Sequence, residues 1–415
     1  MDARFSLTLF RKTAFYALWI LAAAPSWAAI SDEVIKIGLF TDLTGVYSGF
    51  TGKGSVIAAE MAIADAGETI NGKPIKLLVA DHKNDKELAS RIARDWLEKE
   101  NVDVIADVVG SPIALAVQEI NKTKKAVLFF NSVVTTALTG KNCAETGVHW
   151  MYDANSFAAV SGGAITRRGG DTWFFITVDN DFGMNAERIY TNFIVANHGK
   201  VLGHARHPIN TEDFSVYLLK AQMSGAKVIA FANAGEDAIN GIKQSFDLRG
   251  VAKGKTQIMA AVGITDIHRI KLPLSQGMQT HASFYWNLDA KTAAWSNRYF
   301  ALRGEMPHDV HAGIYSSLMH YFKAVKSLGS DDGPSVVKAM RTLPIDSPLL
   351  RNAQLRPDGR MVHDVYLVQV KKPSESKKPW DYFNVLQVIP GSQAFGSLEA
   401  SECPLINKNA AKAQK

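Results

Sequence analysis

The segments VIKIGLF (34–40), SVIAAEMAIADAG (55–67) and PIKLLVADH (74–82) decide the fold class of this chain. The first and third are short apolar runs of strand length, and the middle one carries apolar residues at helical spacing. A strand, a helix and a second strand in this order are typical of a right-handed β-α-β unit with parallel strands. We therefore expect an open α/β sheet.

The same alternation of strands and helices continues in two series, the second starting near residue 150. The expected strands after the opening unit include VDVIADVV (102–109), AVLFFN (126–131), TWFFITV (172–178), KVIAFAN (227–233) and QIMAAVG (257–263). The fold class predicted from this order is α/β, with two Rossmann-like lobes built on parallel sheets. No low-complexity linker separates the two series, which predicts that the chain crosses between the lobes more than once.

The first 28 residues have the pattern of a secretory signal. Arg4, Arg11 and Lys12 form a basic region, and residues 13–24 form an apolar core too short to span a bilayer. Small residues before the end of this segment predict cleavage after Ala28 and export. An uncleaved membrane anchor is the alternative. No later segment approaches 18 uninterrupted apolar residues, so we expect a soluble mature chain.

Charge argues against a nucleic-acid partner. The formal net charge of the 415 residues is +6, and it falls to +4 without the three basic residues and one acid of the signal. The remaining charges are scattered rather than gathered in one block. The densest basic stretch, KKPSESKKPW (371–380), lies between the strand-like runs VYLVQV (365–370) and FNVLQVI (383–389). We interpret it as a solvated hairpin loop.

The chain has two cysteines, Cys143 and Cys403. An exported protein meets an oxidising compartment, which favours a disulfide between them. Such a bond would tie the C-terminal tail to the middle of the chain. Two unpaired, buried cysteines are the alternative, because sequence does not give the distance between the two Cα atoms.

Sequence motifs for catalysis or metal binding are missing or incomplete. The sequence contains no G-x-S-x-G elbow, and TGKGS (51–55) lacks the upstream glycine of a phosphate-binding loop. The pairs His204/His207 and His308/His311 have helical spacing but no evident further ligand except Asp309, so we interpret them as surface histidines near turns. We predict no metal, no cofactor and no enzymatic activity. A serine nucleophile stays open, because catalytic triads assemble in space.

The loops at the carboxyl ends of the expected strands are the place where an open α/β sheet binds ligands. Ser111 precedes Pro112 and is expected to cap a helix, and Thr135 follows the strand at 126–131. Hydroxyls at helix N-termini suit an anion, although each could equally cap its own helix. In FITVDNDFG (175–183), Asp179 ends a strand, and Asp181 is expected to cap the helix that begins near Phe182.

Several long stretches carry a family resemblance. They include IKIGLFTDLTGVYSGFTGKGS (35–55), VDVIADVVGSPIALAVQEI (102–120), RRGGDTWFFITVDNDFG (167–183) and ECPLI (402–406). Together they resemble the leucine/isoleucine/valine-binding branch of type I periplasmic solute-binding proteins. The likeness is strongest to the subset of ABC transporter substrate-binding proteins that captures aromatic acids, and it extends over essentially all of the mature chain.

The resemblance implies a fold and a role. Two lobes joined by three hinge crossovers would close on a small carboxylate-bearing solute, and a periplasmic monomer would deliver it to an ABC permease in the inner membrane. An exported α/β hydrolase and a ligand-sensing module of a receptor remain alternatives. The expected division is a signal peptide at 1–28, one lobe at 33–150 and 283–345, another at 151–282 and 346–391, and a tail at 392–415.

The resemblance also implies which residues bind the ligand. In the first lobe, the residues expected around a carboxylate are Tyr47, Ser111, Ser132, Val133 and Thr135, with Tyr152 by the first crossing. In the second lobe, those expected to select the side chain are Asp179, Asn180, Phe182, Asn233, Glu236 and Thr265. Glu236 or Asp266 could face the ammonium group of an amino acid. The related subset often has an aromatic residue in place of Asn180 and glycine in place of Glu236, so a polar acid or an amino acid stays open.

Overall fold

The structure is a computed structural model that describes residues 30–246, 248 and 257–406. The predicted signal segment and its cleavage after Ala28 lie outside these residues. Among the residues described, no helix is both long and apolar enough to cross a membrane.

The first lobe is built on a six-stranded sheet with the order β2-β3-β1-β4-β5-β6. All neighbours pair in parallel except β2 and β3, which form an antiparallel hairpin. The strands are β1 (Ile35–Thr41), β2 (Thr69–Ile70), β3 (Lys73–Asp81), β4 (Val104–Asp107), β5 (Val127–Phe130) and β6 (Gly147–His149).

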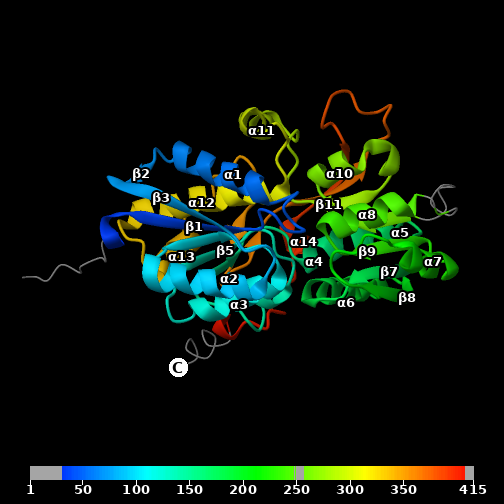
Figure 1. The fold of residues 1–415 in the computed structure, drawn as a ribbon, viewed down its shortest axis with the longest axis horizontal. Helices are drawn as coiled ribbons and strands as arrows, with labels where there is room; N and C mark the ends of the chain where they lie inside the picture. The colour runs from blue at the N-terminus through cyan, green and yellow to red at the C-terminus, as the bar shows by residue number, and fades with distance from the viewer. Residues whose placement is uncertain (1–29, 247, 249–256, 407–415) are drawn as a thin grey trace, which may run out of the picture.

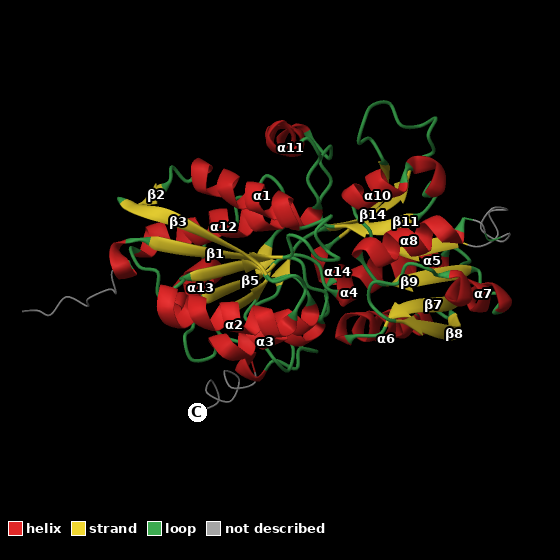
Figure 2. Ribbon diagram, in the orientation of Figure 1, coloured by secondary structure: helices red, strands yellow, loops and turns green. Residues whose placement is uncertain are grey.

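Helices cover both faces of this sheet, as Figure 2 shows. One core joins α1, α12 and α13 to the sheet, and a separate core holds α2, η2 and α3 against the other face. The helical elements of this lobe are η1 (Ser31–Glu33), α1 (Gly52–Asp65), α2 (Lys86–Asp95), η2 (Trp96–Glu100), α3 (Ser111–Asn121), η3 (Thr136–Leu138), α11 (Ala290–Arg303), α12 (Asp309–Leu328) and α13 (Gly333–Thr342).

The second lobe has a seven-stranded sheet with the order β15-β14-β11-β10-β9-β7-β8. The strands from β11 to β8 are parallel, and β14 and β15 add an antiparallel hairpin at one edge. The strands are β7 (Thr172–Val178), β8 (Lys200–His207), β9 (Val228–Ala232), β10 (Gln257–Ala260), β11 (Gln279–Ala282), β14 (Val365–Val370) and β15 (Phe383–Ile389). The prediction of two α/β lobes with mostly parallel sheets is confirmed.

The helices of the second lobe again lie on both faces of its sheet (Figure 1). They are α4 (Ala154–Phe157), η4 (Ala158–Gly162), α5 (Gly163–Arg167), α6 (Asp181–Ala196), α7 (Ser215–Met223), α8 (Gly235–Ser245), α10 (Ile264–Ile270), η5 (Leu272–Leu274) and α14 (Gly391–Ala394). A short antiparallel pair, β12 (Gln354–Leu355) and β13 (Met361–Val362), lies between α13 and β14 in the chain.

The chain passes between the lobes three times, after β6, after β11 and after α13. The first and third passages are joined by a buried ion pair between Asp153 and Arg360, 3.5 Å apart. A backbone bridge between His149 and Arg360 runs beside it. The guanidinium group of Arg360 also lies 4.6 Å from the ring centre of Phe395. These contacts hold the crossing strands together as one hinge.

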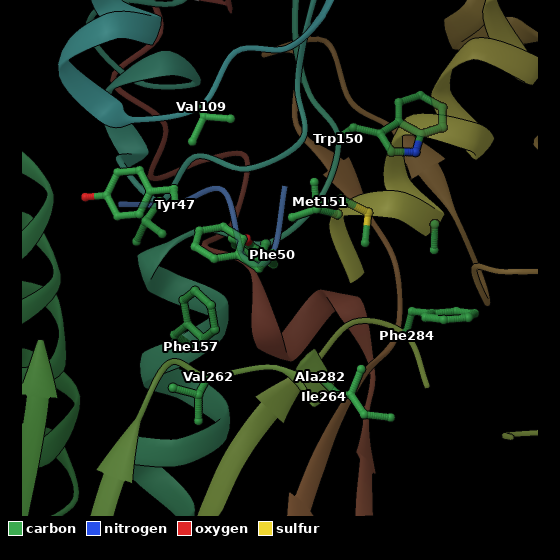
Figure 3. Packing of buried hydrophobic residues seen from close by; sticks show 14 of the residues in the cluster. Tyr47, Phe50, Val109, Trp150, Met151, Phe157, Val262, Ile264, Ala282 and Phe284 are labelled. Atoms are coloured by element: carbon green, nitrogen blue, oxygen red, sulfur yellow. The ribbon is translucent and has the colours of Figure 1, made fainter. Parts of the chain in front are cut away.

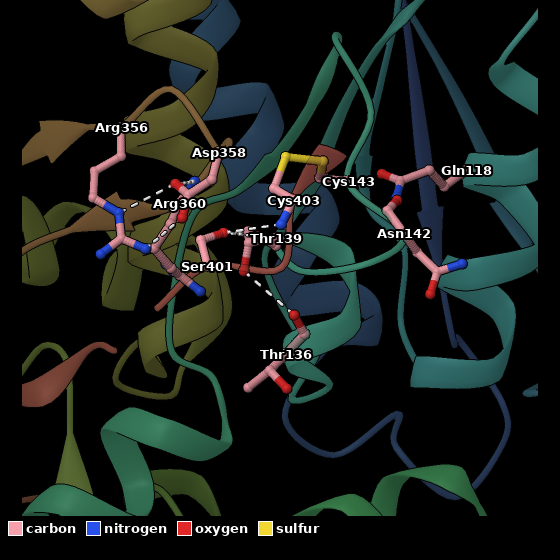
Figure 4. Close-up of a disulfide and its surroundings, with 10 residues drawn as sticks. All are labelled: Gln118, Thr136, Thr139, Asn142, Cys143, Arg356, Asp358, Arg360, Ser401 and Cys403. Atoms are coloured by element: carbon pink, nitrogen blue, oxygen red, sulfur yellow. Dashed lines mark hydrogen bonds and ion pairs between the residues drawn. A yellow bond between two sulfur atoms is a disulfide. The ribbon is translucent and has the colours of Figure 1, made fainter. Parts of the chain in front are cut away.

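A fourth connection follows β15. Cys143 and Cys403 form a disulfide with their Cα atoms 5.5 Å apart, as Figure 4 shows. The hydroxyl of Ser401 donates a hydrogen bond of 3.1 Å to the carbonyl oxygen of Thr139 in the first lobe. The pairing that the sequence left open is therefore present, and it fastens the tail of the second lobe to the first lobe.

The predicted hairpin loop at 371–380 is confirmed, since it joins β14 to β15. The predicted surface position of the histidines is wrong for three of the four. His207 is buried against Phe214, with ring centres 4.9 Å apart. His308 caps α12, and His311 is buried and hydrogen-bonded to Tyr299 at 2.9 Å. Each of these three rings forms a hydrogen bond within the protein in place of one to water, which lowers the cost of burying it.

We predict that replacing both cysteines by serine lowers the free energy of unfolding by about 2–4 kcal/mol, because the closed loop spans 260 residues. Urea denaturation of the oxidised wild type and the double variant would measure this difference. Ser401→Ala is the control, because it keeps the disulfide and removes only the neighbouring hydrogen bonds of the Ser401 hydroxyl, to the carbonyl oxygen of Thr139 and from the N–H of Cys403. It should lower stability by about 1 kcal/mol per bond. Equal unfolding midpoints for wild type and double variant would contradict a stabilising role.

Candidate functional site

A cavity of about 240 Å³ lies where the carboxyl ends of the two parallel sheets face each other. This is the position at which open α/β sheets bind ligands. Loops of both lobes and the crossing segments form its walls. The lining residues from the first lobe include Tyr47, Phe50, Val109, Ser111, Ser132 and Val134; those from the second lobe and the crossings include Tyr152, Phe157, Asn180, Phe182, Ala234, Val262, Asp266, His281, His308 and Asp309.

Much of the wall is aromatic. Figure 3 shows Tyr47, Phe50 and Phe157 near one another, although they come from the β1–α1 loop and from α4. The ring centre of Phe50 lies 5.7 Å from that of Tyr47 and 5.5 Å from that of His308. The ring centre of Phe157 lies 4.8 Å from that of Tyr152. Aromatic and aliphatic walls of this kind suit the apolar part of a small solute.

Ser111 supplies a free polar atom on the first-lobe side. The prediction that Ser111 caps its helix is wrong, because Gly110 occupies the N-cap position and Ser111 is the first residue of α3. Gly110 adopts a φ of 93°, which glycine tolerates. As a result, the Ser111 hydroxyl is buried in the lining, with no hydrogen-bond partner among the described residues. A ligand carboxylate could accept a hydrogen bond from this hydroxyl.

The neighbouring loop after β5 contributes less than the sequence predicted. Ser132 lines the cavity, but its hydroxyl donates to the carboxylate of Asp107. Burial raises the pKa of Asp107 to about 6, against hydrogen bonds that include the one from Ser132. Val133 and Thr135 lie outside the lining, and Val134 takes their place. The hydroxyl of Thr135 accepts a 3.4 Å hydrogen bond from the backbone N–H of Ala137, so it caps its own short helix.

In the loop after β7, Asn180 and Phe182 line the cavity and Asp179 does not. The expected cap at Asp181 is wrong, because α6 begins at Asp181 and its N-cap is Asn180. The side-chain oxygen of Asn180 accepts a 3.0 Å hydrogen bond from the backbone N–H of Gly183. The side-chain amide of Asn180 also lies near the hydroxyl of Tyr47, which belongs to the first lobe.

Three other second-lobe predictions fall beside the lining rather than in it. Asn233 donates a 3.0 Å hydrogen bond from its side chain to His207. Glu236 forms a partly exposed ion pair with Arg269. Thr265 is buried next to the lining residue Asp266. Ala234, next to Asn233, and Asp266, next to Thr265, line the cavity instead, whereas neither chain neighbour of Glu236 does.

Two carboxyl groups dominate the electrostatics of the cavity. One oxygen of Asp266 accepts a 2.9 Å hydrogen bond from the backbone N–H of Gly263, while the other is buried with no partner among the described residues. Asp309 accepts a 2.6 Å hydrogen bond from the N–H of Ser283 in the second crossing. Burial raises the pKa of Asp266 to about 6 and that of Asp309 to about 7.

The histidines of the lining do not supply positive charge to offset these two carboxyl groups. Burial lowers the pKa of His281 and of His308 to about 3, so both rings are neutral at pH 7. Lys86 reaches the lining from an exposed position on α2. The inner part of the cavity is therefore acidic, which suits a solute with a positively charged group.

Several lining residues were not predicted from the sequence: Phe50, Phe157, His281, His308 and Asp309. Phe50 lies in the β1–α1 loop, His281 lies at the carboxyl end of β11, and the other three belong to α4 or to the start of α12, next to the crossings. The nucleophile–base pair that a hydrolase needs is not formed by the predicted hydroxyls. Among the described residues, none of Ser111, Ser132 and Thr135 hydrogen-bonds to a histidine.

We predict that Asp266 makes the unliganded protein less stable as the pH rises. The pKa of this carboxyl is 3.8 without the fold and about 6 within it, so between these values the folded state holds more protons. The free energy of unfolding then falls with rising pH. Chemical denaturation at pH 4.5 and pH 7 would show Asp266→Asn gaining stability over wild type at pH 7 but little at pH 4.5. The same difference at both pH values would contradict this assignment.

Comparisons with known proteins agree with this architecture. A family model described as periplasmic binding protein matches residues 34–377. A solved periplasmic binding protein from Burkholderia mallei is 39% identical, with a TM-score of 0.87, over 90% of this chain and 99% of that chain. A branched chain amino acid ABC transporter periplasmic ligand-binding protein from Burkholderia xenovorans is 36% identical, with a TM-score of 0.81, over 89% and 99% of the two chains.

A curated relative is more distant in sequence. It is a Leu/Ile/Val-binding protein homolog 6 from Brucella melitensis, 22% identical over 380 residues, which cover 88% of this chain and 94% of the relative. Both the family and its leucine/isoleucine/valine-binding branch had been indicated by resemblance, and the comparisons confirm that identification.

Proposed function

Because this chain belongs to the periplasmic binding protein family, we propose that it captures a small carboxylate-bearing solute between its lobes. It would act in the periplasm as a monomer and deliver the solute to an ABC permease of the inner membrane. The observation that carries the proposal is the buried hydroxyl of Ser111 in the first turn of α3, which has no hydrogen-bond partner among the described residues. Free N–H groups at a helix N-terminus and a hydroxyl donor together favour a carboxylate.

The second lobe favours an amino acid over a plain aromatic acid. Asp266 of the second lobe lines the same cavity, and its oxygen that has no partner within the described part of the chain could accept hydrogen bonds from an ammonium group. Buried polar groups normally have partners, so a donor on the solute would satisfy this oxygen. The apolar wall around Phe50 and Phe157 would hold the side chain. The similarity to a branched chain amino acid ABC transporter periplasmic ligand-binding protein from Burkholderia xenovorans supports this choice.

An aromatic acid is the second candidate. The rings of Tyr47, Phe50 and Phe157 would pack against an aryl group as well as against an aliphatic one. Such a solute would place its carboxylate at Ser111, and it would need a hydroxyl or similar donor to satisfy Asp266. The two candidates therefore differ in how strongly they depend on Asp266.

A calorimetric and thermal-shift screen of branched-chain amino acids, aromatic amino acids and hydroxybenzoates tests the proposal. At least one solute should raise the melting temperature, because it binds only the folded state. Ser111→Ala should weaken binding about tenfold or more, since it removes a hydrogen bond to a charged group. Asp266→Asn should weaken binding of an amino acid by a similar factor, because it removes the negative charge. It should weaken binding of a hydroxybenzoate less, because the asparagine oxygen can still accept a hydrogen bond from a hydroxyl.

Asp179→Ala is the matched control, because Asp179 adjoins Asn180 in the same loop but lies outside the lining. It should bind as the wild type does. No response to any of these solutes, or a Ser111→Ala variant with unchanged affinity, would count against a carboxylate at α3.

A further inference from the structure

The lobes meet where the β1–α1 loop of the first lobe touches the start of α8 in the second. Gly235 is the first residue of α8 and has a φ of 61°. A Cβ atom on Gly235 would overlap the carbonyl oxygen of Val46 and lie 3.2 Å from a ring carbon of Tyr47. The two lobes can therefore approach this closely because Gly235 carries a hydrogen atom in place of a side chain.

The first-lobe side of this contact cannot easily give way. The buried carboxylate of Asp42 accepts hydrogen bonds from the N–H of Gly45 at 2.6 Å and from the N–H of Tyr47 at 3.0 Å. The hydroxyl of Thr51 donates to the carbonyl oxygen of Tyr47 at 2.9 Å. The backbone around Val46 is fixed at both of its neighbours, so a displacement there would break these bonds.

The second-lobe side is fixed as well. Asp237, two residues after Gly235, is buried and accepts hydrogen bonds from the N–H of Thr211 at 2.8 Å and of Asn210 at 3.2 Å. The start of α8 is thereby tied to the loop after β8. With both backbones held, extra volume at Gly235 can be relieved only by moving the lobes apart.

A second contact between the lobes differs in this respect. A Cβ atom on Gly49 of the first lobe would lie 2.7 Å from a guanidinium nitrogen of Arg269 of the second. That nitrogen is the far end of a flexible, partly exposed side chain, which pairs with Glu236. It can swing away without moving the backbone, so this contact does not limit how closely the lobes approach.

We propose that Gly235 is a positioning residue that sets how far the cleft closes. Any side chain at this position would hold the lobes apart and widen the space between Tyr47 and the second-lobe wall at Asn180 and Ala234. The consequence for a solute rests on the proposed function. Ser111 and Asp266 belong to different lobes and line one cavity here, so moving the lobes apart would separate the two residues from each other. When a smaller fraction of the molecules can close, the apparent affinity for the solute is lower.

The test compares Gly235→Ala with Gly225→Ala. Gly225 lies in the same lobe with a φ of 70°, and a Cβ atom there would meet nothing within 4 Å. Both substitutions place alanine in the left-handed region, so both should lower the melting temperature to a similar extent. Only Gly235→Ala should weaken binding of the solute found in the screen, by about tenfold or more, chiefly through faster dissociation.

Small-angle scattering provides a readout that backbone strain alone does not change. With saturating solute, wild type and Gly225→Ala should reach the same small radius of gyration, and Gly235→Ala should stay more extended. Gly235→Asn is the second variant, because asparagine tolerates a positive φ and still carries the Cβ atom. It should keep a melting temperature nearer that of wild type and bind as weakly as Gly235→Ala.

Equal affinity and compaction in Gly235→Ala and Gly225→Ala would overturn the proposal. Equal weakening in both would do so too, because strain rather than contact would be the cause. Failure of the proposed function looks different, since no solute would then raise the melting temperature of the wild type. In that case, scattering without solute tests the contact at Gly235. A larger radius of gyration in Gly235→Ala than in wild type and Gly225→Ala would support it. Equal radii in all three proteins would contradict it.

Discussion

The buried ion pair between Asp153 and Arg360 holds the hinge on which the rest of the molecule depends. It joins the first passage between the lobes to the third, and a backbone hydrogen bond of 2.8 Å from the N–H of His149 to the carbonyl oxygen of Gly359 runs beside it. Because the passages are held side by side, the carboxyl ends of both sheets face one space. Leaving one charge of such a pair alone in the interior costs about 3–5 kcal/mol, so the hinge tolerates little change here.

The chemistry of the cavity follows from this arrangement. Each lobe brings buried polar atoms that have no partner among the described residues: the hydroxyl of Ser111 from the first lobe, and an oxygen of Asp266 and a ring nitrogen of His281 from the second. Folding normally satisfies such groups, because an unpaired buried donor or acceptor costs about 1–3 kcal/mol. A solute with an acceptor at one end and a donor at the other would recover that cost only when both lobes reach it. In the proposed function, capture and closure would thereby be coupled through these residues.

The sequence located the loops of the site better than the residues. Asn180 caps α6 where Asp181 was expected, Val134 lines the cavity where Val133 was expected, and Asp266 lines it beside Thr265. Strand ends follow from hydrophobic patterns, and these identify each loop. The residue that turns inward depends on backbone geometry at single positions. The N-cap of α3 falls on Gly110, so the Ser111 hydroxyl does not cap the helix and has no partner among the described residues. Local pattern does not contain this geometry.

What the sequence determined by itself is the order of strands and helices, the basic hairpin loop at 371–380 and the family resemblance, because each depends on residues close together in the chain. Tertiary structure alone decided that Cys143 meets Cys403, that Asp309 joins Asp266 in the cavity, and that Gly235 touches Val46. These contacts join segments far apart in sequence. Their distances are set by how the lobes pack around the hinge, which periodicity and composition do not specify.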